Sequence, residues 1–134
     1  MKGIISIFLT VFFSACSSNP SSVTKPESDV VQVATTGATR ISGDVAWNKI
    51  RAGALLVDVR SPEEFKTGAV KGAINIPHTD VESNLSKFGE VKDREIVLYC
   101  HSGRRAGVAK ETLERAGYTH VFNVGGLSDL NSIK

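Results

Sequence analysis

The sequence predicts an α/β fold with a mostly parallel central sheet of about five strands and helices on both faces. Short apolar runs alternate with segments that have apolar residues at helical spacing, and the connections between them are short. The run at residues 96–99 is apolar or aromatic throughout, which is typical of a parallel strand buried on both faces. Alternation of this kind favours a sheet covered by helices on each side.

Length and composition fit one domain of ordinary core size. The chain has 134 residues, of which 41% are hydrophobic. The net charge is only +2, with acidic and basic residues interleaved, so we expect no nucleic-acid partner. The three histidines are scattered along the chain, so we expect no metal site. We expect a monomer.

The first fifteen residues have the layout of a secretory signal peptide. Met1 and Lys2 precede an apolar run that is much shorter than the roughly 20 residues of a membrane-spanning helix. The small residues before Cys16 resemble a bacterial lipoprotein processing site, which predicts a lipid on Cys16. Ser17 in place of an aspartate then favours the outer membrane. The alternative is a plain signal peptide and a soluble periplasmic protein.

The rest of the chain divides into a tether, residues 16–39, and a domain, residues 40–134. The tether is rich in Ser, Thr and Pro and has no sustained periodicity, although residues 30–33 could add a short edge segment.

The first half of the domain contains two predicted helices and two predicted strands. Ser42 is the expected N-cap of a helix that Gly53 ends, and its apolar face comprises Val45, Ala46, Trp47 and Ile50. Strands are expected at residues 54–59 and 73–76. Between them, Ser61 and Glu64 match a capping box, which predicts a short helix over residues 62–66.

The second half is predicted to continue the alternation. A modest amphipathic helix with Val81, Leu85 and Phe88 stops at Gly89, and strands are expected at residues 96–99 and 121–124. The helix between these strands covers residues 106–116, with Val108, Ala109, Leu113 and Ala116 on its apolar face. Gly125 and Gly126 are expected to turn the chain into a C-terminal segment, residues 127–133.

Polar and small residues gather where the predicted strands end. The residues that end or directly follow a strand are Asp58, Arg60, His78, Cys100 and Gly125. Ligands of open parallel sheets bind beyond the carboxyl ends of the strands. Topology alone therefore predicts a site at this edge.

Cys100 is the expected nucleophile of that site. Ser102 and Gly103 suit a tight turn, after which the unpaired N–H groups of a helix and the cations Arg104 and Arg105 favour a thiolate. If Cys16 carries lipid, Cys100 is the one free thiol of the chain. The alternative is an inert buried cysteine, which two adjacent arginines argue against.

Three segments resemble the motifs of the rhodanese family of sulfurtransferases, and in particular its small, single-domain, secreted phage-shock type. They are residues 56–78, LVDVRSPEEFKTGAVKGAINIPH, residues 96–118, IVLYCHSGRRAGVAKETLERAGY, and residues 121–130, VFNVGGLSDL. In the last segment Leu130 stands where the family often has an aromatic residue. The resemblance covers residues 41–130 and implies a rhodanese-like fold.

The resemblance implies a thiosulfate sulfurtransferase. A Cys100 thiolate would take the outer sulfur of thiosulfate as a persulfide and pass it to cyanide or a thiol, with no cofactor. Backbone amides of the loop, residues 101–105, would stabilise the charged sulfur. Arg104 and Arg105 would bind the donor, or one of them would fasten the loop. Asp58 and Arg60 are expected to be supports, and His101 is not needed as a base. His78 and His120 are expected at the rim or surface.

Three other functions compete with this hypothesis. A cysteine phosphatase or arsenate reductase needs an arginine six positions after the cysteine, where this chain has Ala106. A thiol-disulfide oxidoreductase needs a second cysteine near Cys100, which the sequence lacks. A binding or sulfur-relay module for a periplasmic protein thiol remains open.

Overall fold

The structure of the chain is a computed structural model that describes residues 39–132. These residues belong to the larger of two units of the chain, residues 31–134. The predicted signal peptide, Cys16 and all but the last residue of the predicted tether lie outside the described residues. In order, the elements are α1 (Gly43–Arg51), β1 (Leu55–Asp58), α2 (Pro62–Thr67), β2 (Ile74–Asn75), the 3₁₀ helix η1 (Glu82–Phe88), β3 (Ile96–Cys100), α3 (Arg104–Arg115), β4 (Val121–Gly126) and α4 (Leu127–Asn131).

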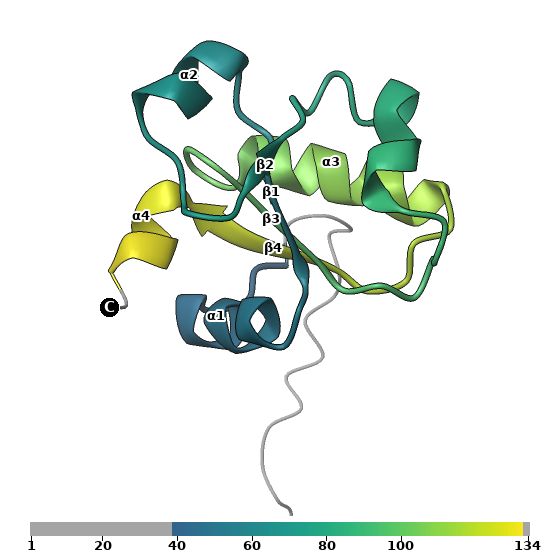
Figure 1. The fold of residues 1–134 in the computed structure, drawn as a ribbon, viewed down its shortest axis with the longest axis horizontal. Helices are drawn as coiled ribbons and strands as arrows, with labels where there is room; N and C mark the ends of the chain where they lie inside the picture. The colour runs from purple at the N-terminus through teal and green to yellow at the C-terminus, as the bar shows by residue number, and fades with distance from the viewer. Residues whose placement is uncertain (1–38, 133–134) are drawn as a thin grey trace, which may run out of the picture. The chain divides into compact units, whose positions relative to one another are not determined.

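The predicted α/β fold is confirmed. The strands form one parallel sheet in the order β2-β1-β3-β4 (Figure 1). The sheet has four strands in the described part of the chain, close to the five that we expected. Beyond β4, Arg40 makes an isolated parallel bridge with Asn123, and the Ile41 N–H donates to the Asn123 carbonyl at 2.9 Å. A single bridge therefore stands where a further edge strand would begin.

Each face of the sheet carries its own apolar core. The helices α3 and η1 cover one face and α1 and α4 cover the other (Figure 1). All five residues of β3 are buried because this central strand contributes side chains to both cores. The first core is built around Ile96, Leu98 and Leu113, and the second around Val97 and Tyr99. The uninterrupted apolar run in the sequence is explained by this double burial.

The predicted caps of α1 and α2 are present. The Ser61 hydroxyl accepts the Glu64 N–H at 3.3 Å, and the Glu64 carboxylate accepts the Ser61 N–H at 3.2 Å. Ser42 caps α1 by accepting the Val45 N–H at 3.5 Å. Trp47 packs against the second core and donates its indole N–H to the Leu130 carbonyl at 2.9 Å, so it anchors α1 to α4.

Three details of the predicted elements were wrong. Val45 and Val108 are 43% and 48% exposed, so neither belongs to the buried face of its helix. The amphipathic helix after β2 is a 3₁₀ helix, interrupted by non-helical backbone at Asn84. Gly125 and Gly126 continue β4 and do not form a turn, because a register shift opposite Leu98 and Tyr99 keeps both glycines paired with β3.

Within residues 39–132, none of the helices has the length and apolar character needed to cross a membrane.

Candidate active site

Cys100 ends the central strand β3 and lies at the carboxyl edge of the sheet. Its neighbours on that edge are Asp58, which ends β1, and Gly126, which ends β4. The sequence-predicted site residues of these strands therefore lie on one edge, as parallel topology requires. The Cys100 side chain is buried and is a free thiol.

A backbone amide is directed at the Cys100 sulfur. The Gly103 N–H donates to Cys100 Sγ at 3.0 Å. Gly103 has φ 85°, in the left-handed region that favours glycine, and it is the N-cap of α3. The loop therefore reverses sharply, and the sulfur lies beside the N-terminus of a twelve-residue helix, where the helix dipole favours negative charge.

Arg105 fastens the cysteine loop to α2. Its guanidinium makes a bidentate pair with the Glu64 carboxylate, at 2.6 Å from Nη1 to Oε2 and 2.9 Å from Nη2 to Oε1. The pairing lowers the pKa of Glu64 to about 2. It also raises the pKa of Arg105, to which the nearby Cys100 adds a smaller contribution. Glu64 also closes the capping box of α2, so one carboxylate joins that helix to the loop.

Arg104 has different surroundings, although it is the next residue in the chain. Its side chain is exposed and makes no ion pair among the described residues. It lines a cavity of about 470 Å³ at the loop. The lining residues are His78, His101, Ser102, Arg104, Arg105 and Val108. The exposed Val108 is thereby explained, because it lies at the cavity and not over the core.

Asp58 and Arg60 form a buried ion pair beneath the first strand-to-helix turn. Arg60 Nη2 is 2.7 Å from Asp58 Oδ2, and the Arg60 backbone N–H also donates to this carboxylate. The hydrogen bond to Asp58 raises the pKa of Arg60. Arg60 Nη2 further donates to the Gly68 carbonyl at 2.5 Å. The pair supports the segment around α2 and makes no direct contact with the cysteine loop in these hydrogen bonds.

Three residues that contact the loop were not among those predicted for the site. Arg40 donates to the Ser102 carbonyl at 2.6 Å, and Asn123 Nδ2 donates to the Gly103 carbonyl at 2.9 Å. Glu64 was predicted only as a capping residue. The one signal that could have revealed Asn123 is its position as a polar residue inside the apolar run of residues 121–124. Nothing in the local pattern around Arg40 points to the loop.

The glycines of β4 let that strand approach the cysteine loop closely. A Cβ on Gly126 would lie 2.4 Å from the His101 carbonyl oxygen, and a Cβ on Gly103 would lie 2.8 Å from Gly125 Cα. In both cases the Cβ would meet a backbone atom, which cannot shift without a large cost in free energy. A side chain at either position would therefore displace the loop.

The three histidines lie at the cavity or at the surface, which for His78 and His120 is where we expected them. His101 is exposed and, together with the partly buried His78, it lines the cavity. His120 is exposed and pairs with the Thr119 hydroxyl at 3.0 Å, away from the cavity lining.

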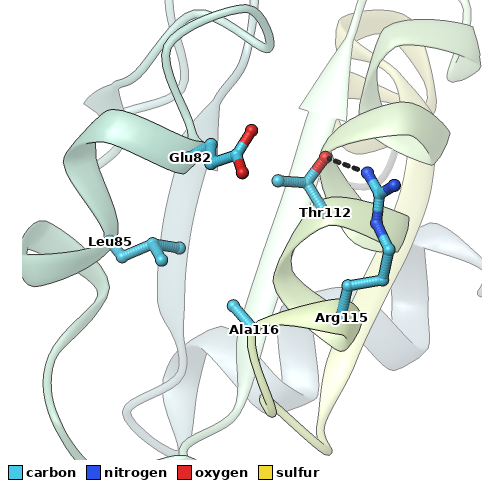
Figure 2. Close-up of a pocket in the computed structure, with 5 residues that line it drawn as sticks. All are labelled: Glu82, Leu85, Thr112, Arg115 and Ala116. Atoms are coloured by element: carbon cyan, nitrogen blue, oxygen red, sulfur yellow. Dashed lines mark hydrogen bonds between the residues drawn. The ribbon is translucent and has the colours of Figure 1, made fainter.

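A second cavity of about 340 Å³ lies between η1 and α3. Figure 2 shows its five lining residues, with Glu82 and Leu85 from η1 facing Thr112, Arg115 and Ala116. Arg115 donates to the Thr112 hydroxyl at 3.3 Å. This cavity lies at the C-terminal end of α3, roughly 16 Å along the helix from its N-terminus. None of the residues predicted for the site lines it.

Comparison with known proteins gives consistent matches. The family described as Rhodanese-like domain matches residues 42–132. The thiosulfate sulfurtransferase PspE of Escherichia coli is 45% identical over 74 residues, which cover 55% of this chain and 71% of PspE. The human thiosulfate:glutathione sulfurtransferase is 33% identical over 85 residues, which cover 54% of this chain and 74% of the human protein.

Two solved structures show the same fold. A rhodanese with anions from E. coli is 43% identical, with a TM-score of 0.55, and the match covers 57% of this chain and 91% of that one. The human single-domain sulfurtransferase TSTD1 is 29% identical, with a TM-score of 0.63, and the match covers 72% and 98% of the two chains.

Proposed function

The chain belongs to the rhodanese-like domain family, and from this we propose that it is a sulfurtransferase acting on thiosulfate or a persulfide donor through Cys100. The acceptor is cyanide or a thiol. The observation that carries the proposal is the thiol of Cys100 with the Gly103 amide directed at its sulfur, beside a cavity lined by Arg104.

The proposed reaction has two steps. The Cys100 thiolate attacks the outer sulfur of thiosulfate, the S–S bond of the donor breaks, and sulfite leaves with the bonding electron pair. The product is a Cys100 persulfide. An acceptor such as cyanide then attacks the outer sulfur and leaves as thiocyanate, which returns the thiolate. This is covalent catalysis with no cofactor beyond the persulfide itself.

The residues around Cys100 have separate roles in this proposal. The Gly103 amide stabilises negative charge on the thiolate and the persulfide. Arg104 binds the oxyanion end of the donor, because its exposed guanidinium lines the cavity and makes no ion pair among the described residues. Arg105 fastens the loop through Glu64. Asp58 and Arg60 support the neighbouring turn.

The residues five and six positions after Cys100 disfavour a phosphatase. The sixth position after the cysteine is Ala106, which is buried in the first core. Arg105, one position earlier, is engaged with Glu64. The chain therefore has no arginine at the position from which phosphatases and arsenate reductases clamp a tetrahedral oxyanion.

Formation of the persulfide tests the proposal. Incubation of the protein with thiosulfate is expected to add the mass of one sulfur to the peptide that contains Cys100, and cyanide is expected to remove it. The Cys100→Ser variant is the control and should gain no sulfur. A folded protein that gains no sulfur under these conditions would overturn the proposal.

The acceptor is proposed to be a small thiol, cyanide or a periplasmic protein thiol. Transfer from a persulfide-loaded protein to glutathione or cyanide at a useful rate supports a small acceptor. If loaded protein transfers sulfur only to a partner captured as a mixed disulfide with Cys100, a sulfur-relay role is supported instead.

We also propose that residues 1–15 direct export and that Cys16 carries lipid, which would anchor a monomeric domain at the outer membrane facing the periplasm. Metabolic labelling with a fatty acid tests this, with Cys16→Ala as control. Unlabelled wild-type protein that is released as a soluble periplasmic protein would support the plain signal peptide.

A further inference from the structure

Arg40 contacts the cysteine loop from a distant part of the sequence. Its Nη2 donates to the Ser102 carbonyl oxygen at 2.6 Å, across 62 positions of the chain. Arg40 precedes residues 42–132, the segment that matches the family. The contact therefore comes from the segment just before that match.

The acceptor of this hydrogen bond belongs to the peptide unit that binds the sulfur. The carbonyl of Ser102 and the N–H of Gly103 are the two ends of one peptide group, and every described peptide bond is trans. A trans peptide directs its C=O and N–H in opposite directions. Arg40 thus holds the oxygen end of the group whose N–H donates to Cys100 Sγ at 3.0 Å.

The position of Arg40 is fixed by the sheet. Arg40 makes a parallel bridge with Asn123, and the next residue, Ile41, donates its N–H to the Asn123 carbonyl at 2.9 Å. The Asn123 side chain in turn donates to the carbonyl of Gly103 at 2.9 Å. Two successive carbonyls of the loop are therefore held from the β4 side of the site.

Gly103 leaves the space that the guanidinium occupies. A Cβ at this position would lie 2.8 Å from both Cζ and Nε of Arg40. The Arg40 head group therefore packs directly on the backbone of the loop. A cation at this point polarises the peptide group, since it stabilises the negative end of the peptide dipole while the positive end faces the sulfur.

We propose that Arg40 is a positioning residue that holds the Ser102–Gly103 peptide with its N–H directed at the Cys100 sulfur and strengthens that donor by its charge. Its role for the thiolate follows from the geometry alone. Its role for the persulfide rests on the proposed function.

The reactivity of the thiol tests the inference without any sulfur donor. Alkylation by iodoacetamide would be followed on the Cys100 peptide by mass spectrometry, across a pH series, in the full chain. In Arg40→Met the alkylation rate at pH 7 is expected to fall about 3–10-fold, because one charge-assisted contact favours the thiolate by this order. Arg40→Lys keeps the charge and should recover part of the rate.

Arg51→Met is the matched control, because Arg51 lies on α1 and its side chain contacts Asn48 and the Trp47 ring. It removes the same charge away from the loop and should leave the profile unchanged. The proposal is overturned if Arg40→Met and Arg51→Met give the same profile within twofold, or if Arg40→Lys is as slow as Arg40→Met.

Thermal unfolding of each variant separates positioning from loss of fold. If Arg40→Met does not fold, the comparison is made with Arg40→Gln, which keeps a donor and loses the charge. A protein that shows the expected alkylation profile but takes no sulfur from thiosulfate would retain the positioning role and contradict the proposed function.

Discussion

Arg104 and Arg105 are adjacent in the chain but have separate surroundings. One step along an α-helix rotates the side chain by about 100°, so neighbouring residues face different directions. Arg105 is directed at Glu64 on α2, whereas Arg104 is exposed at the cavity. The planar, bidentate geometry of the Arg105 pair also makes it a poor site for lysine. Removal of Arg104 and removal of Arg105 are therefore expected to have different effects on the protein.

We predict that Arg104→Ala raises the KM for thiosulfate about tenfold and leaves thermal stability unchanged, since a solvent-exposed guanidinium contributes mainly to binding the dianion. Arg105→Ala is expected to lower stability and the rate of sulfur loading, because the loop loses its link to α2. Steady-state kinetics and thermal unfolding measure both effects. Arg115→Ala, at the other end of α3, is the control. Equal kinetic effects of Arg104→Ala and Arg115→Ala would contradict binding of the donor by Arg104.

The Glu64 to Arg105 pair is predicted to make stability depend on pH. The pKa of Glu64 is lowered to about 2 in the folded chain, from an ordinary 4.5, mainly by Arg105. A depressed carboxyl pKa stabilises the fold above the unfolded-state pKa, and that stabilisation is lost as the pH falls from about 4.5 towards 2. Because the carboxylate is partly exposed, we expect about 0.5–1 kcal/mol at pH 7.

Comparison with Glu64→Gln measures this contribution, because glutamine keeps an acceptor for the capping box. Wild type should unfold about 2–6 °C above the variant at pH 7, and the gap should narrow by pH 3 and close towards pH 2. The exposed Glu111→Gln serves as control and should show no such gap. A gap that stays constant from pH 7 to pH 3 would mean that the charge of Glu64 has no part in it.

At the residue scale, the sequence could predict those site residues whose chemical type is unusual in its local context. It could not predict the residues that reach the site only through the fold. Cys100 and its two arginines are visible because a thiol beside cations at a helix start is chemically unusual. Arg40 is an ordinary surface residue in the sequence, and its contact with Ser102 exists only because a bridge to Asn123 brings it to the loop. Non-local contacts of this kind leave no local pattern to detect.

At the scale of elements, β4 and the cysteine loop form one closely packed unit. The strand ends in two glycines whose missing side chains leave space for the His101 carbonyl and for the Arg40 and Asp129 side chains. The pattern of the sequence favoured a turn at these glycines, since paired glycines usually break a strand. They are paired with Tyr99 and Cys100 instead, because their function here is to permit close approach.

We predict that Gly126→Ala lowers the rate of sulfur loading about 10–100-fold, because the added Cβ would lie 2.4 Å from the His101 carbonyl oxygen and displace the loop. The backbone of Gly126, at φ −97°, is ordinary for alanine, so strain at this position does not explain the loss. Loading is measured by mass spectrometry of the Cys100 peptide after a short pulse of thiosulfate.

Gly53→Ala is the matched control for this prediction. Gly53 has φ 104° and open space around the position of a Cβ, so alanine there costs about 1–2 kcal/mol of stability without touching the loop. It should lower the melting temperature and leave sulfur loading intact. If Gly126→Ala loads sulfur as fast as wild type, the close packing of β4 against the loop is not required for the reaction.

At the scale of the whole described molecule, the fold was predictable because the pattern of burial is simple. A central strand that is apolar on both faces requires helices on both faces, and the two cores on either side of β3 follow from this. The short 3₁₀ helix η1 was harder to predict, since only Phe88 among its residues is fully buried and a kink at Asn84 interrupts its periodicity. The start of the domain at residue 40 stays a prediction, made from the composition of the preceding segment and from the Ser42 cap of the first helix.

Arg40 and Ile41 contact both the sheet, at Asn123, and the cysteine loop, at Ser102. Chains truncated before and after these two residues therefore separate effects on stability from effects on function. We predict that a chain beginning at Arg40 folds and loads sulfur like the longer protein, because Arg40 itself makes the bridge and the cap and helix α1 follow it. A chain beginning at Ser42 keeps the cap of α1 and the whole segment that matches the family, but it lacks the Ile41 N–H bond to Asn123 and the Arg40 contact with Ser102.

The shorter chain should therefore fold with a melting temperature lower by about 5–10 °C, the order expected for one backbone bond and one partly buried isoleucine. Its sulfur loading should fall further than this loss of stability explains, because the Ser102–Gly103 peptide is no longer held at its oxygen. Thermal unfolding and pulse loading of both chains below their melting temperatures measure the two effects. If the chain beginning at Arg40 fails to fold, residues before 40 are part of the domain and the predicted tether is too long. If both chains fold and load sulfur equally, the flank before residue 42 has no role in the site.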